Sequence, residues 1–218
     1  MEKNKIVIYG TGLQAEQVWY FFKHYLAGKV VAFTVDKDFY NVTEFRGLPV
    51  IPFETIEEKY PPGNTDLFVA IGPQYMNLTR QRIYKEGKKR GYGFADCKLD
   101  NSIYPDLKCG KNAFIHASKI APFVSVKENV FLQNCNIGHH TRIEENVFIN
   151  SVTMGGAVVI GKNAFIGLGA VLGPKVHIGA YSFIGMGCIV NQDTKPYSVL
   201  TSRKTKERNI NSLKLKLC

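Results

Sequence analysis

The chain has 218 residues, of which 45% are hydrophobic and 21% charged, and its formal net charge is +10. This length suits one large or two modest globular domains, and the composition excludes a disordered or low-complexity protein. No uncharged apolar run reaches the ~20 residues of a membrane-spanning helix, and no signal-peptide core follows the first residues. We therefore expect a cytoplasmic protein with no transmembrane segment.

The cysteines and the basic residues further limit the kinds of site and partner that this protein can have. The five cysteines are odd in number and show no CxxC spacing, which argues against a disulfide framework or a zinc site. Basic residues concentrate at 85–90 and in the tail at 201–218, a pattern that favours polyanionic partners such as phosphorylated metabolites. A merely solubilising surface is the alternative. We expect no nucleic-acid partner, because no motif with interleaved aromatic residues accompanies the charge.

Strands and helices alternate over residues 1–100. KIVIYGTG (5–12) predicts a buried strand that ends in a glycine turn, and a helix follows over 13–26. Further strands are expected at 30–35, at 66–72 as the third strand, and near residue 94, with helices near 54–59 and over 77–90. This alternation is typical of a small doubly wound α/β domain.

The glycine turn is a candidate phosphate site. Gly10 and Gly12 precede a helix whose free backbone N–H groups favour an anion. Asp36 follows the second strand, about where a Rossmann domain places its ribose-binding acid, and Gly72 ends a strand at the same sheet edge. Because Ala15 holds the third place of GxGxxG, a turn without a ligand and a nicotinamide site stay open.

From about residue 101 to 200 the sequence repeats every six residues. Large aliphatic residues stand at 160, 166, 172, 178, 184 and 190; glycine follows the first five, and a small residue comes four places after each of these five. Backwards to residue 115 the register contains three steps of five, 17 residues apart, which indicates three hexads per turn. This pattern predicts a parallel β-helix with the aliphatic side chains inside and rungs about 4.8 Å apart. A β-sandwich would show irregular turn spacing.

Together the two halves resemble a known family. VIYGTG, AFTVD, VAIG, NIGHHTRI and VVIGKNAFIGLGAVL follow one another as in the sialic acid O-acetyltransferases and PglD-like sugar N-acetyltransferases, and span nearly the whole chain. The resemblance implies a Rossmann-like domain over 1–100 that binds a nucleotide-linked amino sugar, a left-handed parallel β-helix over 101–200, and a basic tail over 201–218. It also implies acetyl-CoA as co-substrate, bound along the coil between subunits of a homotrimer.

The resemblance also assigns site residues. It implies nucleotide-sugar contacts at Gly10, Gly12, Leu13, Asp36 and Gly72. It implies contacts to CoA at Phe148, Gly156, Leu168, Gly185 and Met186. Phe148 departs from the family, because a relative carries a histidine there.

His139 and His140 occupy corner positions of one hexad and are expected to face away from the core. Acetyl transfer to an amine requires a neutral nucleophile, and imidazole, with a reference pKa of about 6.5, can take the proton near neutral pH. The resemblance gives His139 the role of general base. In several relatives a carboxylate follows this histidine and orients it. Here His140 stands in its place, which leaves Glu144, Glu145 or a backbone carbonyl as candidate orienting groups.

These observations predict an acetyl-CoA-dependent acyltransferase for surface glycan synthesis, with N-acetylation of a nucleotide-linked 4-amino-dideoxy sugar as the first hypothesis. Sugar O-acetylation is one alternative, and a non-catalytic β-helix trimer that binds a nucleotide sugar is another. Some β-helices of this shape are zinc enzymes, but His116, His139 and His177 hold different hexad positions and do not line one corner. We therefore expect no metal.

Overall fold

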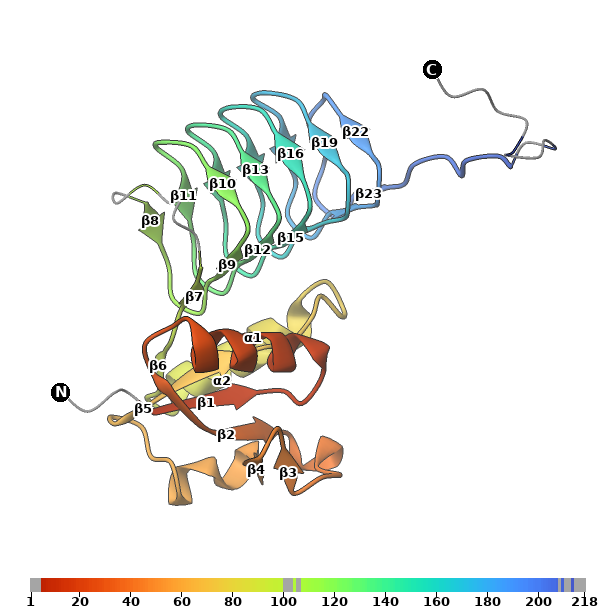
Figure 1. Cartoon of the computed structure of the whole chain (residues 1–218). Helices are drawn as coiled ribbons and strands as arrows, with labels where there is room; N and C mark the ends of the chain where they lie inside the picture. Colours follow the sequence, from red (N-terminus) through yellow and green to blue (C-terminus); the bar gives the residue numbers. More distant parts are fainter. Residues whose placement is uncertain (1–4, 100–103, 105–106, 208, 210–212, 214–218) are drawn as a thin grey trace.

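The computed structural model describes residues 5–99, 104, 107–207, 209 and 213. An α/β domain lies beside a β-helix, and residues 201–207, which follow β23 (Val199–Leu200), run away from both (Figure 1). None of the helices in the described part of the chain is long and apolar enough to cross a membrane.

The α/β domain contains a six-stranded sheet in the order β3-β4-β2-β1-β5-β6, parallel except for β3. Its strands are β1 (Lys5–Tyr9), β2 (Lys29–Val35), β3 (Glu44–Phe45), β4 (Leu48–Pro52), β5 (Thr65–Val69) and β6 (Gly93–Phe94). The α-helices are α1 (Leu13–His24) and α2 (Leu78–Lys89), and the 3-10 helices are η1 (Lys37–Phe39) and η2 (Phe53–Glu58).

Both faces of this sheet are covered, because successive side chains of a strand point to opposite sides. Ile6 and Ile8 of β1 belong to the core under α1, which buries one helical stripe against the sheet. Val7 and Tyr9 belong to the core under η2 and α2. The domain is thus the three-layer α/β arrangement that the alternation of elements predicts.

One parallel strand, β4, is missing from the sequence-based expectation. Its residues include Pro49 and Pro52, and proline, which cannot donate to a ladder, argues against a strand. The structure tolerates them because only the two-residue β3 lies beyond β4, and Pro52 is the last residue of the strand. The strand expected at 66–72 is present as β5, but because β4 precedes it, β5 is the fourth parallel strand along the chain and not the third.

The β-helix has three parallel sheets. A five-stranded sheet, here the β10 face, contains β10 (Lys119–Ile120), β13 (Asn136–Ile137), β16 (Thr153–Met154), β19 (Val171–Leu172) and β22 (Ile189–Val190). The β8 face contains β8 (Lys108–Cys109), β11 (Ser125–Val126), β14 (Arg142–Ile143), β17 (Val159–Ile160) and β20 (His177–Ile178). The docking face contains β7 (Cys97–Lys98), β9 (Phe114–His116), β12 (Phe131–Gln133), β15 (Phe148–Asn150), β18 (Phe165–Ile166), β21 (Phe183–Ile184) and β23.

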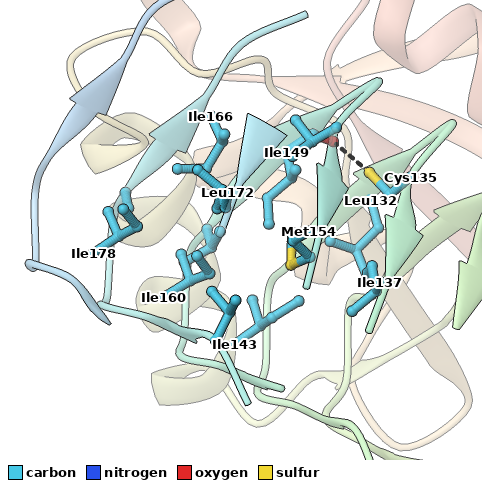
Figure 2. Close-up of a cluster of buried hydrophobic side chains, with 14 of the residues drawn as sticks. Leu132, Cys135, Ile137, Ile143, Ile149, Met154, Ile160, Ile166, Leu172 and Ile178 are labelled. Atoms are coloured by element: carbon cyan, nitrogen blue, oxygen red, sulfur yellow. Dashed lines mark hydrogen bonds between the residues drawn. The ribbon is translucent and has the colours of Figure 1, made fainter. Parts of the chain in front are cut away.

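The strand register confirms three hexads per turn. Ile143 pairs with Ile160, and Ile160 with Ile178, on successive rungs of the β8 face. The anchors predicted from the period of six are all buried, and Figure 2 shows their side chains reaching into one common interior from the surrounding strands. Strand pairing in the coil already begins at Cys97, because β7 pairs with β9.

Aromatic rings stack along the docking face. The ladder consists of Phe114, Phe131, Phe148, Phe165 and Phe183, with neighbouring ring centroids 5.0–5.9 Å apart. The first three rings share a core with α1 and the sheet of the α/β domain. The first three rings therefore pack the coil against the α/β domain. Phe165 and Phe183 extend the ladder along the coil beyond this contact.

A second ladder, of asparagines, lies at the corner between the β8 face and the docking face. Its members, all in left-handed backbone conformation with φ between 58° and 62°, are Asn112, Asn129, Asn146 and Asn163. Their buried amides hydrogen-bond in sequence at 2.7, 2.8 and 3.4 Å. Asparagine tolerates this conformation better than most residues, which suits it to a repeated corner.

Arg80 of α2 joins the α/β domain to this corner. Its fully buried Nη2 donates to three coil carbonyl oxygens, those of Asn129, Asn146 and Val147, and Nη1 donates to the Ile71 carbonyl. Burial lowers the pKa of Arg80 to about 9, so the guanidinium remains charged at neutral pH. A cation held by backbone dipoles therefore fixes the docking of α2.

Candidate functional site

The carboxyl ends of β1, β2 and β5 form one edge of the α/β sheet, beside the start of α1. Gly10 follows β1 with φ 118°, and a Cβ there would lie 3.1 Å from the Ala70 carbonyl oxygen, so this turn requires glycine. Gly12 is the N-cap of α1, and Leu13 is 86% exposed. Gly72 follows β5 at the same edge. The first N–H groups of α1 have no acceptor within the helix, and a Cβ at Gly12 would meet nothing within 4 Å.

Asp36, at the end of β2, is held by two side chains that the sequence does not predict. Its carboxylate forms an ion pair with Arg82 of α2. Its backbone N–H donates to the Tyr9 hydroxyl oxygen at 3.1 Å. Burial and the nearby Asp36 carboxylate raise the pKa of Tyr9, so its hydroxyl stays protonated. The sheet edge thus carries a cation as well as the predicted acid.

A groove of about 580 Å³ lies on the docking face of the coil. The rings of Phe148, Phe165 and Phe183 line it, and Leu168 and Met186, 47% and 66% exposed, stand beside them. The lining also includes Gly185, Pro73 of the loop after β5, and Thr201 and Ser202 at the start of the tail. The structure thus brings together four of the five residues that the sequence assigns to CoA.

His139 and His140 lie at the corner between β13 and β14. This corner joins the β10 face to the β8 face, so it lies on the side of the coil away from the docking face and the α/β domain (Figure 1). Within one chain, the two histidines are therefore separated from both the sheet edge and the groove.

The two imidazole rings contact each other directly. The Nδ1 atoms of His139 and His140 are 2.9 Å apart, and the ring planes are at 89°. Since a hydrogen bond needs one donor and one acceptor, one Nδ1 carries the hydrogen and the other offers its lone pair. His140 has φ 58°, and its ring packs on Phe123 with centroids 4.7 Å apart.

Gly156, one coil further along, lies against the His139 ring. A Cβ at Gly156 would stand 2.6 Å from Cε1 and 2.7 Å from Nε2 of His139. The sequence assigns Gly156 to CoA, but the structure places it beside the imidazole and not in the docking-face groove. The missing side chain makes room for His139.

The carboxylates considered as orienting groups lie elsewhere. Glu144 and Glu145 occupy the next corner and line a groove of about 1030 Å³ between the coil and α2. In a single chain they are therefore not beside His139, and the group that does contact its Nδ1 is the ring of His140.

His140 also borders a smaller groove, of about 500 Å³, on the β8 face. Among the described residues that line this groove, the charged or titratable ones are Lys108, His140, Arg142 and His177. The surroundings of the histidine pair are thus basic.

No group of three His, Cys, Asp or Glu side chains within the described ranges could hold a metal ion. His116 lies on the docking face against Phe21, with ring centroids 4.7 Å apart. His177 lies on the β8 face and His139 at a corner, so the three histidines occupy three different parts of the coil.

Comparisons with known proteins agree with this architecture. Residues 157–192 match the family model of the bacterial transferase hexapeptide (six repeats). These residues carry the hexapeptide repeat. No curated protein sequence matches the chain significantly.

Several solved structures share the whole arrangement. A histidine-to-asparagine variant of perosamine N-acetyltransferase from Caulobacter crescentus, in complex with CoA and GDP-perosamine, is 22% identical, with a TM-score of 0.80 over 89% of this chain and 92% of that chain. The acetyltransferase domain of PglB from Neisseria gonorrhoeae, in complex with acetyl coenzyme A, is 19% identical (TM-score 0.74; 86% and 93%). WeeI from Acinetobacter baumannii is 19% identical (TM-score 0.71; 90% and 96%). At these identities the likeness shows a shared fold.

Proposed function

We propose that this protein is an acetyl-CoA-dependent acetyltransferase that N-acetylates a nucleotide-linked amino sugar. The observation that carries this proposal is the exposed His139–His140 pair seated against Gly156 in a hexapeptide coil. Chains of this fold include an enzyme bound to CoA and GDP-perosamine and a domain bound to acetyl coenzyme A. Kinship with the PglD-like and sialic acid O-acetyltransferases, a left-handed coil and a Rossmann-like domain over 1–100 belong to the same proposal.

We assign the nucleotide sugar to the edge of the α/β sheet. The N–H groups at the start of α1, after Gly10 and Gly12, favour the negative charge of a diphosphate. Arg82 adds a cation at this edge, and Asp36 offers an acceptor for a ribose hydroxyl. Leu13 and Gly72 supply exposed surface beside them, so the five residues assigned from the sequence form one binding surface.

We assign acetyl-CoA to the docking-face groove. Its aromatic and aliphatic lining suits the methylene and gem-dimethyl groups of the long pantetheine arm of CoA. The basic tail follows directly after Ser202 and begins with Arg203 and Lys204, whose charges suit the phosphates of CoA.

The proposed site needs more than one copy of the chain, because His139 lies on the opposite side of the coil from the groove. A second copy could bring its histidine corner to the groove of the first. If each copy uses its corner once and its groove once, the contacts are head-to-tail, and such contacts can close into a ring. The exposed apolar side chains of Val171 and Ile189 on the β10 face suit such an interface. We infer that the ring is the homotrimer implied by the family resemblance, with sites shared between subunits.

In this site His139 acts as general base. Its Nδ1 is occupied by His140, which leaves Nε2 for the substrate amine. As the amine nitrogen attacks the thioester carbonyl, Nε2 takes the proton that the nitrogen loses, and the sulfur of CoA leaves. Gly156 keeps the ring in one position, so the base is oriented before the substrate arrives.

The function is tested by incubating the protein with acetyl-CoA and a panel of nucleotide-linked amino sugars and their hydroxyl counterparts, while free thiol is followed. We expect thiol release with at least one amino sugar. Release with hydroxyl sugars alone would move the assignment to O-acetylation. Binding of the sugar nucleotides without thiol release from any combination of acetyl-CoA and sugar would contradict the proposed catalysis.

Gly156→Ala is expected to lower kcat by about tenfold to a hundredfold. The new Cβ would overlap the His139 ring and force it to move, and displacements near 1 Å at a reacting group cost about this much. The backbone at Gly156 lacks positive φ, so alanine fits it without strain, and the unfolding midpoint should stay near that of the wild type.

Gly173→Ala is the matched control, because it lies at the same kind of corner in the next coil. A Cβ there meets nothing closer than 3.4 Å. This variant should keep the wild-type kcat. Equal kcat values for the wild type and Gly156→Ala would show that the ring does not need this space.

A further inference from the structure

His140 is the side chain that contacts the proposed base, at the position where related proteins are expected to carry a carboxylate. An imidazole cannot supply a fixed negative charge, but it can accept a proton. We propose that His140 is a positioning residue that takes the Nδ1 proton of His139 during the reaction and returns it. This inference rests on the proposed function and specifies how the base works.

The direction of the hydrogen bond follows from the role of His139. If His139 Nδ1 donates to His140 Nδ1, the lone pair on His139 Nε2 is free for the substrate. In the opposite arrangement His139 Nε2 would carry a hydrogen and could not accept a proton. The contact at 2.9 Å accommodates the tautomer of His139 that a base requires.

Contacts of its own hold His140 in place. Its backbone N–H donates to the Pro122 carbonyl at 3.2 Å, and its ring packs on Phe123 of the preceding coil. The left-handed backbone at His140, φ 58°, recurs at the same corner of the neighbouring coils, at Phe123 and Ala157, so it belongs to the regular coil. The acceptor nitrogen is thus fixed independently of the substrate.

The proton transfers balance without any further reactant. As the C–N bond forms, His139 Nε2 takes the amine proton while the Nδ1 proton crosses to His140 Nδ1, so the positive charge lies on His140. As the C–S bond breaks, the sulfur takes the Nε2 proton and the Nδ1 proton returns to His139. Both rings end in their starting state, and the products are the amide and the free thiol.

Among the described residues, Lys108, Arg142 and His177 line the groove beside His140, and the carboxylates of Glu144 and Glu145 lie in a different groove. The carboxylate of Asp193 accepts the backbone N–H of His177 at 2.8 Å. The group that contacts His139 Nδ1 is thus the ring of His140 and not a carboxylate.

The kinetic test compares His140→Asn with His140→Asp. Asparagine can accept the Nδ1 hydrogen bond but cannot take up the proton, so kcat should fall about tenfold to a hundredfold with both KM values nearly unchanged. Aspartate should retain more activity than asparagine, and it should move the acidic limb of the kcat/KM profile to higher pH, because its charge stabilises the imidazolium of His139. Wild-type kcat and an unshifted pH profile in both variants would overturn the inference.

A second measurement does not depend on activity. Long-range ¹H–¹⁵N correlation spectra of histidine-labelled protein should show His139 protonated at Nδ1 and His140 unprotonated there. His24→Asn, on α1, removes one set of signals without touching the pair and serves as the control. A His139 ring that carries its hydrogen at Nε2 would overturn the inference even in an active enzyme. An intact pair in a protein without transferase activity would instead contradict the proposed function.

Discussion

His139→Asn is expected to reduce kcat by about two to four orders of magnitude, the usual cost of losing a general base. Asparagine keeps a side chain of similar reach but cannot accept a proton. Because His139 lies at an exposed corner outside the core, the free energy of unfolding should change by no more than about 0.5 kcal/mol. Steady-state thiol release and denaturant unfolding measure the two effects separately.

The control for this prediction also tests the shared site. Leu168→Glu places a carboxylate in the groove and should weaken acetyl-CoA binding in every site of its own homo-oligomer. Refolding equal amounts of the His139→Asn and Leu168→Glu chains together should restore about one quarter of the wild-type activity, since half of the corners and half of the grooves are intact. A full wild-type kcat for His139→Asn would exclude it as the base, and a mixture without activity would place each site within one chain.

The β-helix could be predicted in detail because its rule is local. Every sixth residue must fill the same narrow interior, so the aliphatic anchors and the small residues beside them can be read without knowing any contact across the molecule. The asparagine ladder has a signal of the same kind, because Asn112, Asn129, Asn146 and Asn163 are 17 residues apart. The period of the aliphatic positions alone does not predict this ladder.

The docking of the α/β domain could not be predicted in this way. Whether Arg80 is buried or exposed depends on how α2 packs against the coil. An arginine in a helix is ordinarily exposed. The ion pair between Arg82 and Asp36 depends on the same packing. The sequence does not predict β4 for a different reason. Its two prolines argue against a strand more strongly than its apolar residues argue for one.

Within the candidate site, the sequence predicts which side chains are functional better than it predicts which residues contact them. His139 stands out because a corner needs no histidine, but its contact with His140 depends on the rotamers of two exposed side chains, which the sequence does not specify. Gly156 follows His139 by 17 residues, one turn of the coil. Because one turn of the coil brings corresponding corner residues together, this spacing itself predicts that Gly156 lies beside the His139 ring.

Arg80→Met is expected to lower the free energy of unfolding by about 3 kcal/mol. The variant leaves the buried carbonyls of Asn129, Asn146 and Ile71 without the guanidinium donors, and each unsatisfied buried acceptor costs about 1–3 kcal/mol. Removing a desolvated charge and filling the space with an apolar chain offset part of this loss. Urea unfolding measures the difference.

Lys89→Met, an exposed substitution on the same helix, is the matched control and should stay within about 0.5 kcal/mol of the wild type. Because α2 also carries Arg82, a loosened helix should raise KM for the sugar nucleotide more than KM for acetyl-CoA. Arg80→Lys keeps the charge but cannot reach four carbonyls from one nitrogen, so it should restore little stability. An Arg80→Met protein as stable as Lys89→Met would show that aromatic packing alone, without the buried cation, holds the α/β domain on the coil.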